Sequence, residues 1–528
     1  MKKSLRAELA ADPSVGTGNV LATVIARGAD LNGPGLTFDT AVDHFPAEHP
    51  LTLGELDDRV QARTAWLHAH GIGRRDVVAI WATDAADIVL SFLALTRVGA
   101  IPALLNGKMA PEIAEEYIRR LRVNGVLADA AHQKLLAGPF LGAPKDLGSG
   151  DPAKAPEHYR HHRDDPVVIT HTSGTTGVPK AVLHTHTTLY AALKHLLTMP
   201  QAQGTDRILN ALPIPHTATI LMVNQVLGNR AEMLLLSSQD APVVLAAIER
   251  WKPRGVYGFA VTWAGLARED LSRYAVESVR MWFNTGDCAH EPHIRKLVAA
   301  GSRETVTREG RVLVPGSHFV DGLGSSEMGH NGFHVTHTPD SEHYGRCIGK
   351  PYQFATAVVL DAEGNELPDG TPGLLGFRSP SVSPGYWNDS VNTYRFRLNG
   401  WFLTGDLAYR AASGNYFHLD RIPDAVAGFD GPQLYTSMSE ERILAALPEV
   451  QDCTVIVVPE GDGFVTDVLL ESDSAGDFEA AVRTAVGEEV AGTIRRVSVV
   501  GRDEVPVTVT GKVRKVALRE DRLAEVGP

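Results

Sequence analysis

Thr172-Ser-Gly-Thr-Thr-Gly-Val-Pro-Lys180 is the stretch that decides the fold of this chain. Its composition suits a phosphate-binding loop, because glycine lets the backbone approach a ligand closely, hydroxyl groups donate hydrogen bonds and lysine adds a positive charge. The runs at residues 166–170 and 181–184 on either side are short and mostly apolar, which predicts strands. We therefore expect a loop that joins two strands and holds phosphate.

Two other interpretations of this loop compete with that one. A Walker-type loop ends in Gly-Lys-Ser/Thr and runs directly into a helix, and neither feature is present here. A surface turn rich in Ser, Thr and Gly would have the same composition. Composition alone does not separate such a turn from a phosphate-binding loop.

Length and charge set the first limits on fold and function. The chain has 528 residues, too many for one ordinary hydrophobic core, so two or more domains are expected. Its net charge of −13 argues against nucleic acid as the principal partner, because binding a nucleic-acid backbone needs concentrated Lys and Arg. Cys288, Cys347 and Cys453 lie far apart and form no metal-ligand or disulfide spacing.

Hydropathy predicts a cytoplasmic protein with no membrane partner. No apolar run reaches the ~18 residues that a membrane-spanning helix needs. The first residues, Met1-Lys-Lys-Ser-Leu-Arg, are not followed by the apolar core of a signal peptide.

The chain after residue 50 alternates between helical and extended patterns. Apolar residues recur at helical spacing over residues 51–70, and buried strands are predicted at 76–81 and 100–106, on either side of a helix at 84–98. Helices that alternate with strands in this way form βαβ units, in which helices cover parallel strands. The predicted fold class is α/β.

A polar, proline-rich bridge follows at residues 141–165 and contains His158-Tyr-Arg-His-His-Arg163. Neighbouring histidines bind metal in some proteins, but side chains at i and i+1 point apart in regular structure and no carboxylate pattern accompanies these. We expect a solvated loop without a metal.

In the order of its residues, the loop at 172–180 closely resembles the signature loop of the adenylate-forming superfamily, which includes acyl-CoA synthetases, peptide-synthetase adenylation domains and luciferases. Later segments resemble the same family, so the resemblance covers nearly the whole chain. It implies a large AMP-binding domain of several subdomains at residues 1–420 and a small, mobile α+β lid domain at 421–528. The loop residues that would contact the phosphates of ATP or AMP are Thr172, Ser173, Gly174, Thr175, Thr176, Gly177 and Lys180.

The segment Leu212-Pro-Ile-Pro-His-Thr217 is similar to the family segment beside the reacting carboxylate. His216 is therefore a candidate catalytic and pocket residue, although a lone histidine after a proline turn is also a common packed surface residue. Residues 256–263 are predicted as a buried strand whose end forms a pocket wall, with Trp263 and Asn284 as further pocket candidates.

The turn at Gly286, Asp287 and Cys288 resembles a family turn that lies against adenine and the acyl group. A strand-to-helix turn that needs glycine for its backbone would explain these residues nearly as well.

The segment at residues 319–329 resembles the aromatic-Gly-x-Thr-Glu motif of the family. By that resemblance Glu327 would hold Mg²⁺, a hard cation suited to carboxylate and phosphate oxygens. Leu323 stands where the family usually places an aromatic ring that stacks on adenine, and loss of such a ring predicts nucleotide binding weaker by ~1–3 kcal/mol, borrowing the range for stacked bases. The nucleotide-contacting residues implied here are Leu323, Gly324, Ser325 and Ser326.

Two later segments also match the family. Asp406, in Gly400-Trp-Phe-Leu-Thr-Gly-Asp-Leu407, would accept hydrogen bonds from both ribose hydroxyls, and Arg421 would reach the ribose or a phosphate. Lys512, near the end of Val505-Pro-Val-Thr-Val-Thr-Gly-Lys512, would bridge the carboxylate and the α-phosphate while charge builds up on phosphorus. The structural alternatives are an Asp in a turn after Gly405 and a solvated basic tail.

Two departures from the family pattern concern the hinge. Pro423 occupies a hinge position, and proline fixes φ near −65° and restricts the residue before it. A pinned hinge favours one of the two lid orientations that the family uses for its two half-reactions. The following loop, residues 425–435, lacks the usual lysine, so coenzyme A contacts are not carried over.

The resemblance implies an acyl-CoA ligase. A mainly apolar carboxylic acid, rather than an α-amino acid, would react with ATP to give acyl-AMP, and coenzyme A would then form the thioester. A first alternative is a protein that performs only one half-reaction, chiefly thioester formation from an acyl-AMP that a separate adenylating enzyme supplies, with Lys512 outside the site. A second alternative binds acid or nucleotide without catalysis. The oligomeric state stays open, a homodimer included.

Overall fold

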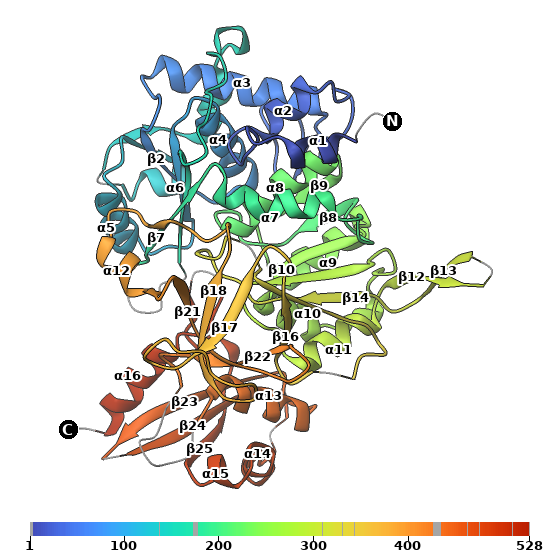
Figure 1. Ribbon diagram of the computed structural model, residues 1–528, viewed down its shortest axis with the longest axis vertical. Helices are drawn as coiled ribbons and strands as arrows, with labels where there is room; N and C mark the ends of the chain where they lie inside the picture. The colour runs from blue at the N-terminus through green and yellow to red at the C-terminus, as the bar shows by residue number, and fades with distance from the viewer. Residues whose placement is uncertain are drawn as a thin grey trace.

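The structure is a computed structural model, and it describes residues 4–136, 138–172, 178–308, 310–329, 331–342, 344–425, 434–461, 463–474, 476–508 and 511–526. It has a mixed α/β architecture, which confirms the predicted fold class (Figure 1). In this described part of the chain, no helix combines the length and the apolar character that crossing a membrane would need.

A seven-stranded sheet carries the signature loop at residues 172–180. β6 (Pro166–His171) pairs antiparallel with β7 (Ala181–Thr185), so the prediction of a loop between two strands is confirmed. The order of the described strands is β19-β7-β6-β3-β2-β4-β5. The other strands are β2 (Val77–Ala82), β3 (Ile101–Asn106), β4 (Gly125–Ala128), β5 (Phe140–Gly142) and β19 (Gly385–Tyr386).

Helices pack on this sheet where helical spacing predicts them. α3 (Leu53–Ala69) begins at a capping box, in which Thr52 accepts from the backbone of Glu55 and the Glu55 side chain accepts from the backbone of Thr52. Such a cap contributes roughly 1 kcal/mol to helix stability. The other helices of this region are α4 (Ala85–Arg97), α5 (Pro111–Leu121) and α6 (Ala130–Gln133), with short 3-10 turns at Pro144–Ser149 and Pro152–Lys154.

A second, larger sheet crosses the middle of the molecule; thirteen of its strands lie in the described residues. Its first half is parallel, from β1 through β9, β8, β10 and β11 to β14, and its second half is antiparallel. The strands are β1 (Thr37–Phe38), β8 (Arg207–Asn210), β9 (Glu232–Leu235), β10 (Gly255–Phe259), β11 (Met281–Thr285), β14 (His318–Asp321), β15 (Phe333–His337), β16 (Cys347–Pro351), β17 (Thr356–Leu360), β18 (Gly373–Arg378), β20 (Arg397–Leu398), β21 (Trp401–Arg410) and β22 (Tyr416–Arg421).

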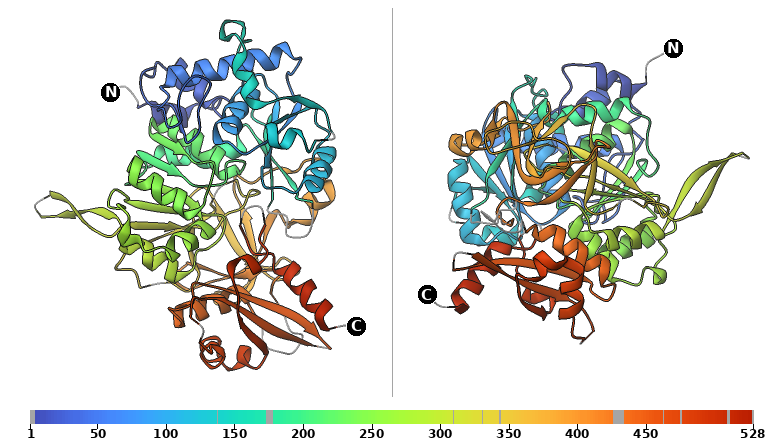
Figure 2. Two further views of the ribbon diagram at one scale, coloured as in Figure 1. Left: turned by 180° about the vertical axis from the view of Figure 1, so that it is seen from behind. Right: turned by 60° about the horizontal axis from the view of Figure 1, so that its bottom comes forward.

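Eight further helices belong to this part of the described chain. They are α1 (Leu5–Ala11), α2 (Val20–Ala26), α7 (Thr188–Thr198), α8 (Thr217–Asn229), α9 (Ala241–Trp251), α10 (Ala260–Arg268), α11 (Glu291–Ala299) and α12 (Ser390–Arg395), with a 3-10 turn at Leu271–Arg273. A two-stranded hairpin of β12 (Ser302–Thr307) and β13 (Gly310–Pro315) projects away from the body (Figures 1 and 2).

The C-terminal residues form a separate small unit at the bottom of Figure 1. β23 (Asp452–Glu460), β24 (Gly463–Glu471) and β25 (Ile494–Val499) make their own sheet, and buried side chains from Leu434 onward form its core. The helices are α13 (Thr436–Ala446), α14 (Glu479–Val486), α15 (Glu488–Ala491) and α16 (Lys515–Val526), with a 3-10 turn at Arg502–Glu504. We call this unit the lid.

Three local predictions were wrong. The predicted strand at 256–263 ends at Phe259 and continues as helix α10. The helix predicted at 477–490 is two helices, because Gly487 has a φ of 86° that no helix contains. The histidine cluster at 158–163 is not a freely solvated loop, since His161 bonds the carbonyl of Thr96 and stacks on His186 with ring centroids 4.8 Å apart.

Candidate active site

The two ends of the signature loop are held together at its base. The Thr172 amide donates to the Lys180 carbonyl at 3.1 Å, and the Lys180 amide donates to Oγ1 of Thr172 at 3.2 Å. Ser173, Gly174, Thr175, Thr176 and Gly177, which the sequence predicts as phosphate contacts, lie outside the described residues. Their roles stay predictions.

Lys180 lies near the carboxylate that the sequence assigns to magnesium. Its Nζ is 4.2 Å from the ring centroid of Phe396 and 5.5 Å from that of Tyr386, and burial lowers its pKa. Tyr386 Oη donates to Glu327 Oε1 at 2.9 Å. A cation over aromatic faces keeps its charge in a half-buried place, so Lys180 and Glu327 offer one positive and one negative group to a nucleotide.

Glu327 fits a magnesium ion that is bound through nucleotide. Mg²⁺ is usually held by one or two carboxylates together with substrate phosphates and water. Among the described residues no cluster of three His, Cys, Asp or Glu side chains could hold a metal without such help. The chain thus offers one oxygen ligand here and leaves the remaining positions to phosphate oxygens and water.

A small cavity of about 20 Å³, open to solvent on one side, lies beside His216. Its lining residues include four of the predicted site positions, and the others come chiefly from α8 and β11. They are His216, Thr217, Ala218, Leu221, Met222, Phe283, Thr285, Gly286, Gly324, Ser325, Gly329 and Asn331. The walls are largely apolar, with neutral polar groups between them, which is the usual composition of a small-molecule pocket.

His216 is fixed as a neutral hydrogen-bond donor. It is the N-cap of α8, and its Nδ1 accepts from the amide of Ala218 at 3.1 Å. The proton is therefore assigned to Nε2, which lies 3.4 Å from Oγ of Ser326. Burial, followed by the charges of His171 and Lys512, lowers the pKa of His216 to about 3. His216 can donate to an oxyanion near neutral pH but is a weak base.

Trp263 and Asn284 do not line this cavity, contrary to the prediction. Both are fully buried, and Nε1 of Trp263 donates to Oδ1 of Asn284 at 2.8 Å. Trp263 packs into a hydrophobic cluster because it lies in α10 rather than in a strand. Asn284 instead donates to the backbone carbonyl of Asp287 and to Asp321, and its own carbonyl accepts from Asn331 at 3.0 Å. These residues support the cavity wall from behind.

Asp287 meets the lid lysine. Its Oδ2 is 3.7 Å from Nζ of Lys512, and its Oδ1 is 3.6 Å from Nη2 of Arg346. Burial alone would raise the pKa of Asp287, but the charges of Lys512 and Arg346 hold it well below its usual range. Next to it, burial raises the pKa of the Cys288 thiol, whose Sγ is 3.5 Å from Oδ2 of Asp321. Cys288 is thus a buried, neutral thiol.

The lid therefore has an orientation in which Lys512 lies against Asp287, next to Gly286 of the cavity wall. Gly511, with a φ of 81°, makes this possible, since a Cβ there would come within 3.0 Å of Val261 on α10. This is not the orientation in which Lys512 would remain outside the site, and whether the chain performs one half-reaction or both stays a prediction. Pro423 lies in the turn after β22, where its carbonyl accepts from Arg519 of α16.

Asp406 is the buried acceptor that the sequence predicts for ribose. It is 4% exposed, its Oδ1 is 3.3 Å from Nη1 of Arg421 and 3.4 Å from Nε2 of His418. Burial opposes its charge, but Arg421 and His418 lower the pKa of Asp406 overall, so it stays ionised. An ionised, fixed carboxylate suits two hydroxyl donors.

The remaining motif residues lie behind or beside the cavity. Gly324 and Ser325 line it, and Ser325 Oγ accepts from the amide of Met328 at 3.2 Å. Ser326 is buried, and its carbonyl bonds Nε2 of His184 at 2.7 Å. Leu323 is 3% exposed and packs in a hydrophobic cluster with Phe333 and Phe377. Leu323 thus has a packing role in this conformation.

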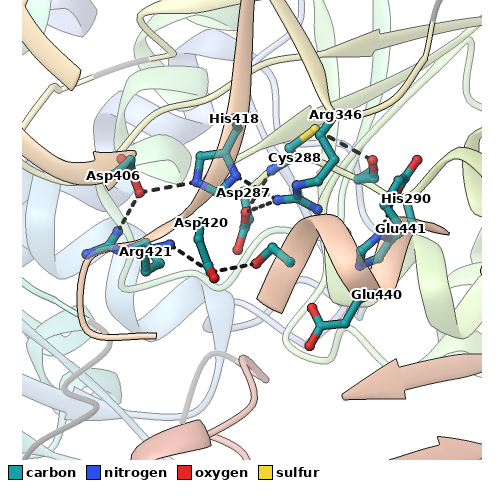
Figure 3. Close-up of polar contacts among 12 residues, drawn as sticks. Asp287, Cys288, His290, Arg346, Asp406, His418, Asp420, Arg421, Glu440 and Glu441 are labelled. Atoms are coloured by element: carbon teal, nitrogen blue, oxygen red, sulfur yellow. Dashed lines mark hydrogen bonds and ion pairs between the residues drawn. The ribbon is translucent and has the colours of Figure 1, made fainter. Parts of the chain in front are cut away.

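Sequence reasoning missed Arg346 and His418. Arg346 Nη2 donates to Nδ1 of His418 at 2.8 Å, and both side chains are almost fully buried (Figure 3). Neither residue belongs to a motif quoted above, because their importance comes from the pairing of β16 with β22. The one signal in the sequence is an unusual charge, an Arg directly before the apolar run Cys347-Ile348.

Further contacts join the lid to the large sheet region. Nδ1 of His290 lies 2.6 Å from Oε2 of Glu441, and Nη2 of Arg268 lies 3.1 Å from Asp452 and 2.6 Å from Glu471. On the hinge side, Asp420 accepts from the amide and hydroxyl of Thr436 and from the hydroxyl of Ser437. Asp420 thus caps α13 from outside the lid.

Comparison with known proteins agrees with this geometry. A family model described as AMP-binding enzyme matches residues 39–387. The chain therefore belongs to the AMP-binding, adenylate-forming enzyme family, which confirms the resemblance found in the sequence.

Individual relatives differ in the reaction their names describe. The chain is 43% identical to 3-aminoavenalumate diazotase of a Streptomyces species, over 98% of each chain. It is 27% identical to a 3-hydroxybenzoate–CoA/4-hydroxybenzoate–CoA ligase of Thauera aromatica, over 90% of this chain and 92% of that one. The anthranilate CoA ligase AuaEII, solved with anthranoyl-AMP, has the same fold, with a TM-score of 0.83 at 21% identity over 98% and 99% of the chains.

Proposed function

We propose that this chain is an ATP-dependent diazotase that acts on an amino-substituted aromatic carboxylic acid. The observation that carries the proposal is the 43% identity with 3-aminoavenalumate diazotase over nearly the full length of both chains. Diazotisation joins the nitrogen of an aryl amine to a second nitrogen, and nitrite supplies that nitrogen in the required oxidation state. The reactants are then an aryl amine, nitrite and ATP.

Nitrite resembles the group that an adenylating site activates. It is a bent O–N–O anion with one negative charge, similar in shape to a carboxylate. Lys512, which lies against Asp287 next to the cavity wall, and the Nε2 proton of His216 would suit an oxygen of either anion. Lys512 would also stabilise the charge that builds up on phosphorus.

The bonds balance without an external oxidant. A nitrite oxygen forms a bond to the α-phosphorus of ATP and the bond to pyrophosphate breaks. The amine nitrogen then attacks the nitroso nitrogen, and AMP leaves with the electron pair of the broken N–O bond. The amine gives up a proton; the N-nitroso product takes up one proton, loses water and becomes the aryl diazonium ion.

The cavity supports an aromatic amine as the acceptor. Leu221, Met222 and Phe283 offer apolar walls for a ring, and the polar groups beside them are neutral. An aryl amine attacks only as the free base, and neutral surroundings do not favour its protonated form. This agrees with the earlier prediction of a mainly apolar acid.

The nucleotide would lie on the opposite side of the site. Asp406 and Arg421 would hold the ribose, Lys180 with the loop at 172–177 would hold phosphates, and Glu327 would hold Mg²⁺. When bound, the ion would neutralise phosphate charge. The lid that carries Lys512 would begin at Arg421, as the sequence predicts.

The test uses the purified full-length chain with ATP, Mg²⁺, nitrite and 3-aminobenzoate or 3-aminocinnamate. At mildly alkaline pH, where nitrous acid is scarce, uncatalysed diazotisation is negligible. We expect a product that couples with an aromatic amine to give an azo dye, together with AMP, and both require nitrite. AMP formation that needs the acid but not nitrite, without dye, would contradict the proposal.

A second candidate is the acyl-CoA ligase that the sequence predicts. It is supported by the 27% identity with a hydroxybenzoate–CoA ligase over most of both chains. Coenzyme A would then replace the amine as acceptor, and the acid carboxylate would replace nitrite. Thioester formation with coenzyme A in the same panel of acids, with no need for nitrite, would favour this candidate.

The half-reaction and non-catalytic alternatives make different predictions. The contact of Lys512 with Asp287 supports adenylation by this chain rather than by a separate enzyme. Exchange of labelled pyrophosphate into ATP is therefore expected. Binding of AMP in a calorimeter without any exchange would favour a protein that only binds.

A further inference from the structure

Arg346 has a backbone conformation that is unusual for its residue type. Its φ is 61°, in the left-handed region that disfavours residues with a Cβ. Its side chain is also buried: the residue is 4% exposed, so a full positive charge lies in the interior. A strained backbone and a buried charge both oppose folding, and both persist where the surroundings or the function require them.

The contacts of Arg346 run in two directions (Figure 3). On one side Nη2 donates to Nδ1 of His418 at 2.8 Å, and on the other it lies 3.6 Å from Oδ1 of Asp287. Because Nδ1 of His418 accepts, the proton of this imidazole is on Nε2, which faces Oδ1 of Asp406 at 3.4 Å. Arg346 therefore sets the tautomer that lets His418 donate to Asp406.

The charges along this chain alternate in sign. Lys512 faces Asp287, Asp287 faces Arg346, and Arg346 reaches Asp406 through His418. Arg421 contacts Asp406 at the far end. Removing Arg346 would take one cation from beside Asp287 and would free His418 to turn or change tautomer. Asp287 would keep Lys512 and Asp406 would keep Arg421, but each carboxylate would lose one of the contacts that fix its position.

We propose that Arg346 is a positioning residue for adenylation, which holds Asp406 for the ribose and Asp287 for Lys512 at the same time. The inference rests on the proposed roles of Asp406 and Lys512, but not on whether nitrite or a carboxylate is activated. It makes nucleotide binding and placement of the lid lysine depend on one guanidinium.

The left-handed backbone of Arg346 provides an informative variant. Arg346→Gly removes the guanidinium and relieves the crowded Cβ, so the backbone needs no rearrangement. Arg346→Lys keeps a charge but loses the planar fork that reaches two partners. Arg122→Gly is a matched control, because Arg122 also has a left-handed φ, of 57°, at the exposed end of α5.

The first measurement is AMP affinity by calorimetry on the full-length variants, with thermal unfolding run alongside. We expect Arg346→Gly to stay folded and to bind AMP about tenfold more weakly, since His418 is no longer held in the orientation that donates to Asp406. Arg346→Lys should bind AMP more tightly than Arg346→Gly but more weakly than the wild type. The control Arg122→Gly should bind AMP as tightly as the wild type. Wild-type affinity in Arg346→Gly would overturn the proposal.

The second measurement is the rate of AMP formation with saturating ATP. A residue that only supports the ribose site changes the KM for ATP, whereas a residue that also places Lys512 lowers kcat. We expect both to change by about tenfold in Arg346→Gly. A changed KM with unchanged kcat would show that Arg346 supports the ribose site but does not place Lys512. Failure of the wild type to make diazonium would count against the proposed function alone, because AMP affinity does not depend on the acceptor.

Discussion

The two sides of the candidate site use different chemistry. The nucleotide side is a chain of alternating charges, from Lys512 and Asp287 to Asp406 and Arg421, in which each ionised group faces an opposite one. The acceptor cavity contains neutral groups among apolar walls, with His216 held neutral by burial. If the proposed function holds, activation of the phosphate would depend on placed charges, whereas choice of the acceptor would depend on shape and neutral hydrogen bonds.

The largest expected effect is at the lid lysine. Lys512→Ala should lower the rate of AMP formation about 10²–10³-fold, because a donor to the developing charge is lost. Stability should hardly change, since its contact with Asp287 is long and partly exposed. Steady-state kinetics with thermal unfolding checks this, with the exposed Lys154→Ala as control. Equal losses of the rate of AMP formation in Lys512→Ala and Lys154→Ala would show that the nucleotide side does not depend on the placed charge of Lys512.

The next effect is at the ribose acceptor. Asp406→Asn keeps the shape but removes the charge that Arg421 and His418 face. A hydrogen bond to a charged group is worth about 1.5–3 kcal/mol, so the KM for ATP should rise about 10- to 100-fold. The KM for the aromatic acid should stay close to wild type. Parallel changes in both constants would show that the two sides are not separate.

A smaller effect is expected in the cavity. Thr285 donates to Asn331 at the cavity wall. Thr285→Val removes one neutral hydrogen bond that holds Asn331 at the wall; such a bond is worth about 0.5–1.5 kcal/mol, so the KM for the aromatic acid should rise by at most about 12-fold. AMP affinity should be unchanged. A calorimetric titration with AMP and a kinetic titration with the acid test the two halves of this statement.

The smallest effect concerns the pH dependence of lid docking. Burial alone would lower the pKa of His290, but its hydrogen bond to Glu441 raises it above the ordinary value, while Arg346 and Glu440 also face it. The stabilisation is therefore complete below the unfolded pKa of ~6.5 and is lost as pH rises through the folded pKa. Tm should therefore fall more steeply with rising pH in the wild type than in His290→Gln, as thermal unfolding over a pH series would measure. Identical slopes of Tm against pH in the two proteins would show that the contact of His290 with Glu441 does not contribute to the pH dependence.

The fold was largely predictable because its patterns are local. The strands around the loop at 172–180 and the helix from Leu53 follow directly from hydrophobic periodicity and capping residues. The run at 256–263 misled because a short apolar run fits a strand and a buried helix equally well. Here the strand ends at Phe259, and the residues from Ala260 onward form the tightly packed helix α10.

Site residues could be predicted from the sequence only where they belong to a recognisable motif. His216 and Gly286 line the cavity, as their segments suggest, whereas the contact of Asp287 with Lys512 was not predicted. Trp263 was placed wrongly because the direction of its side chain depends on the type of element that carries it. Arg346 and His418 lie 72 positions apart and meet only because β16 pairs with β22, which no local pattern encodes.

Asp420 has a consequence for how the lid can move. It is fully buried at the end of β22, and the N-terminus of α13, across the hinge, donates to it through Thr436 and Ser437. A lid that slides away would break these bonds together, whereas a lid that swivels about Asp420 would keep them. A movement of the lid that keeps these hydrogen bonds would therefore have to be a rotation about Asp420, close to Pro423.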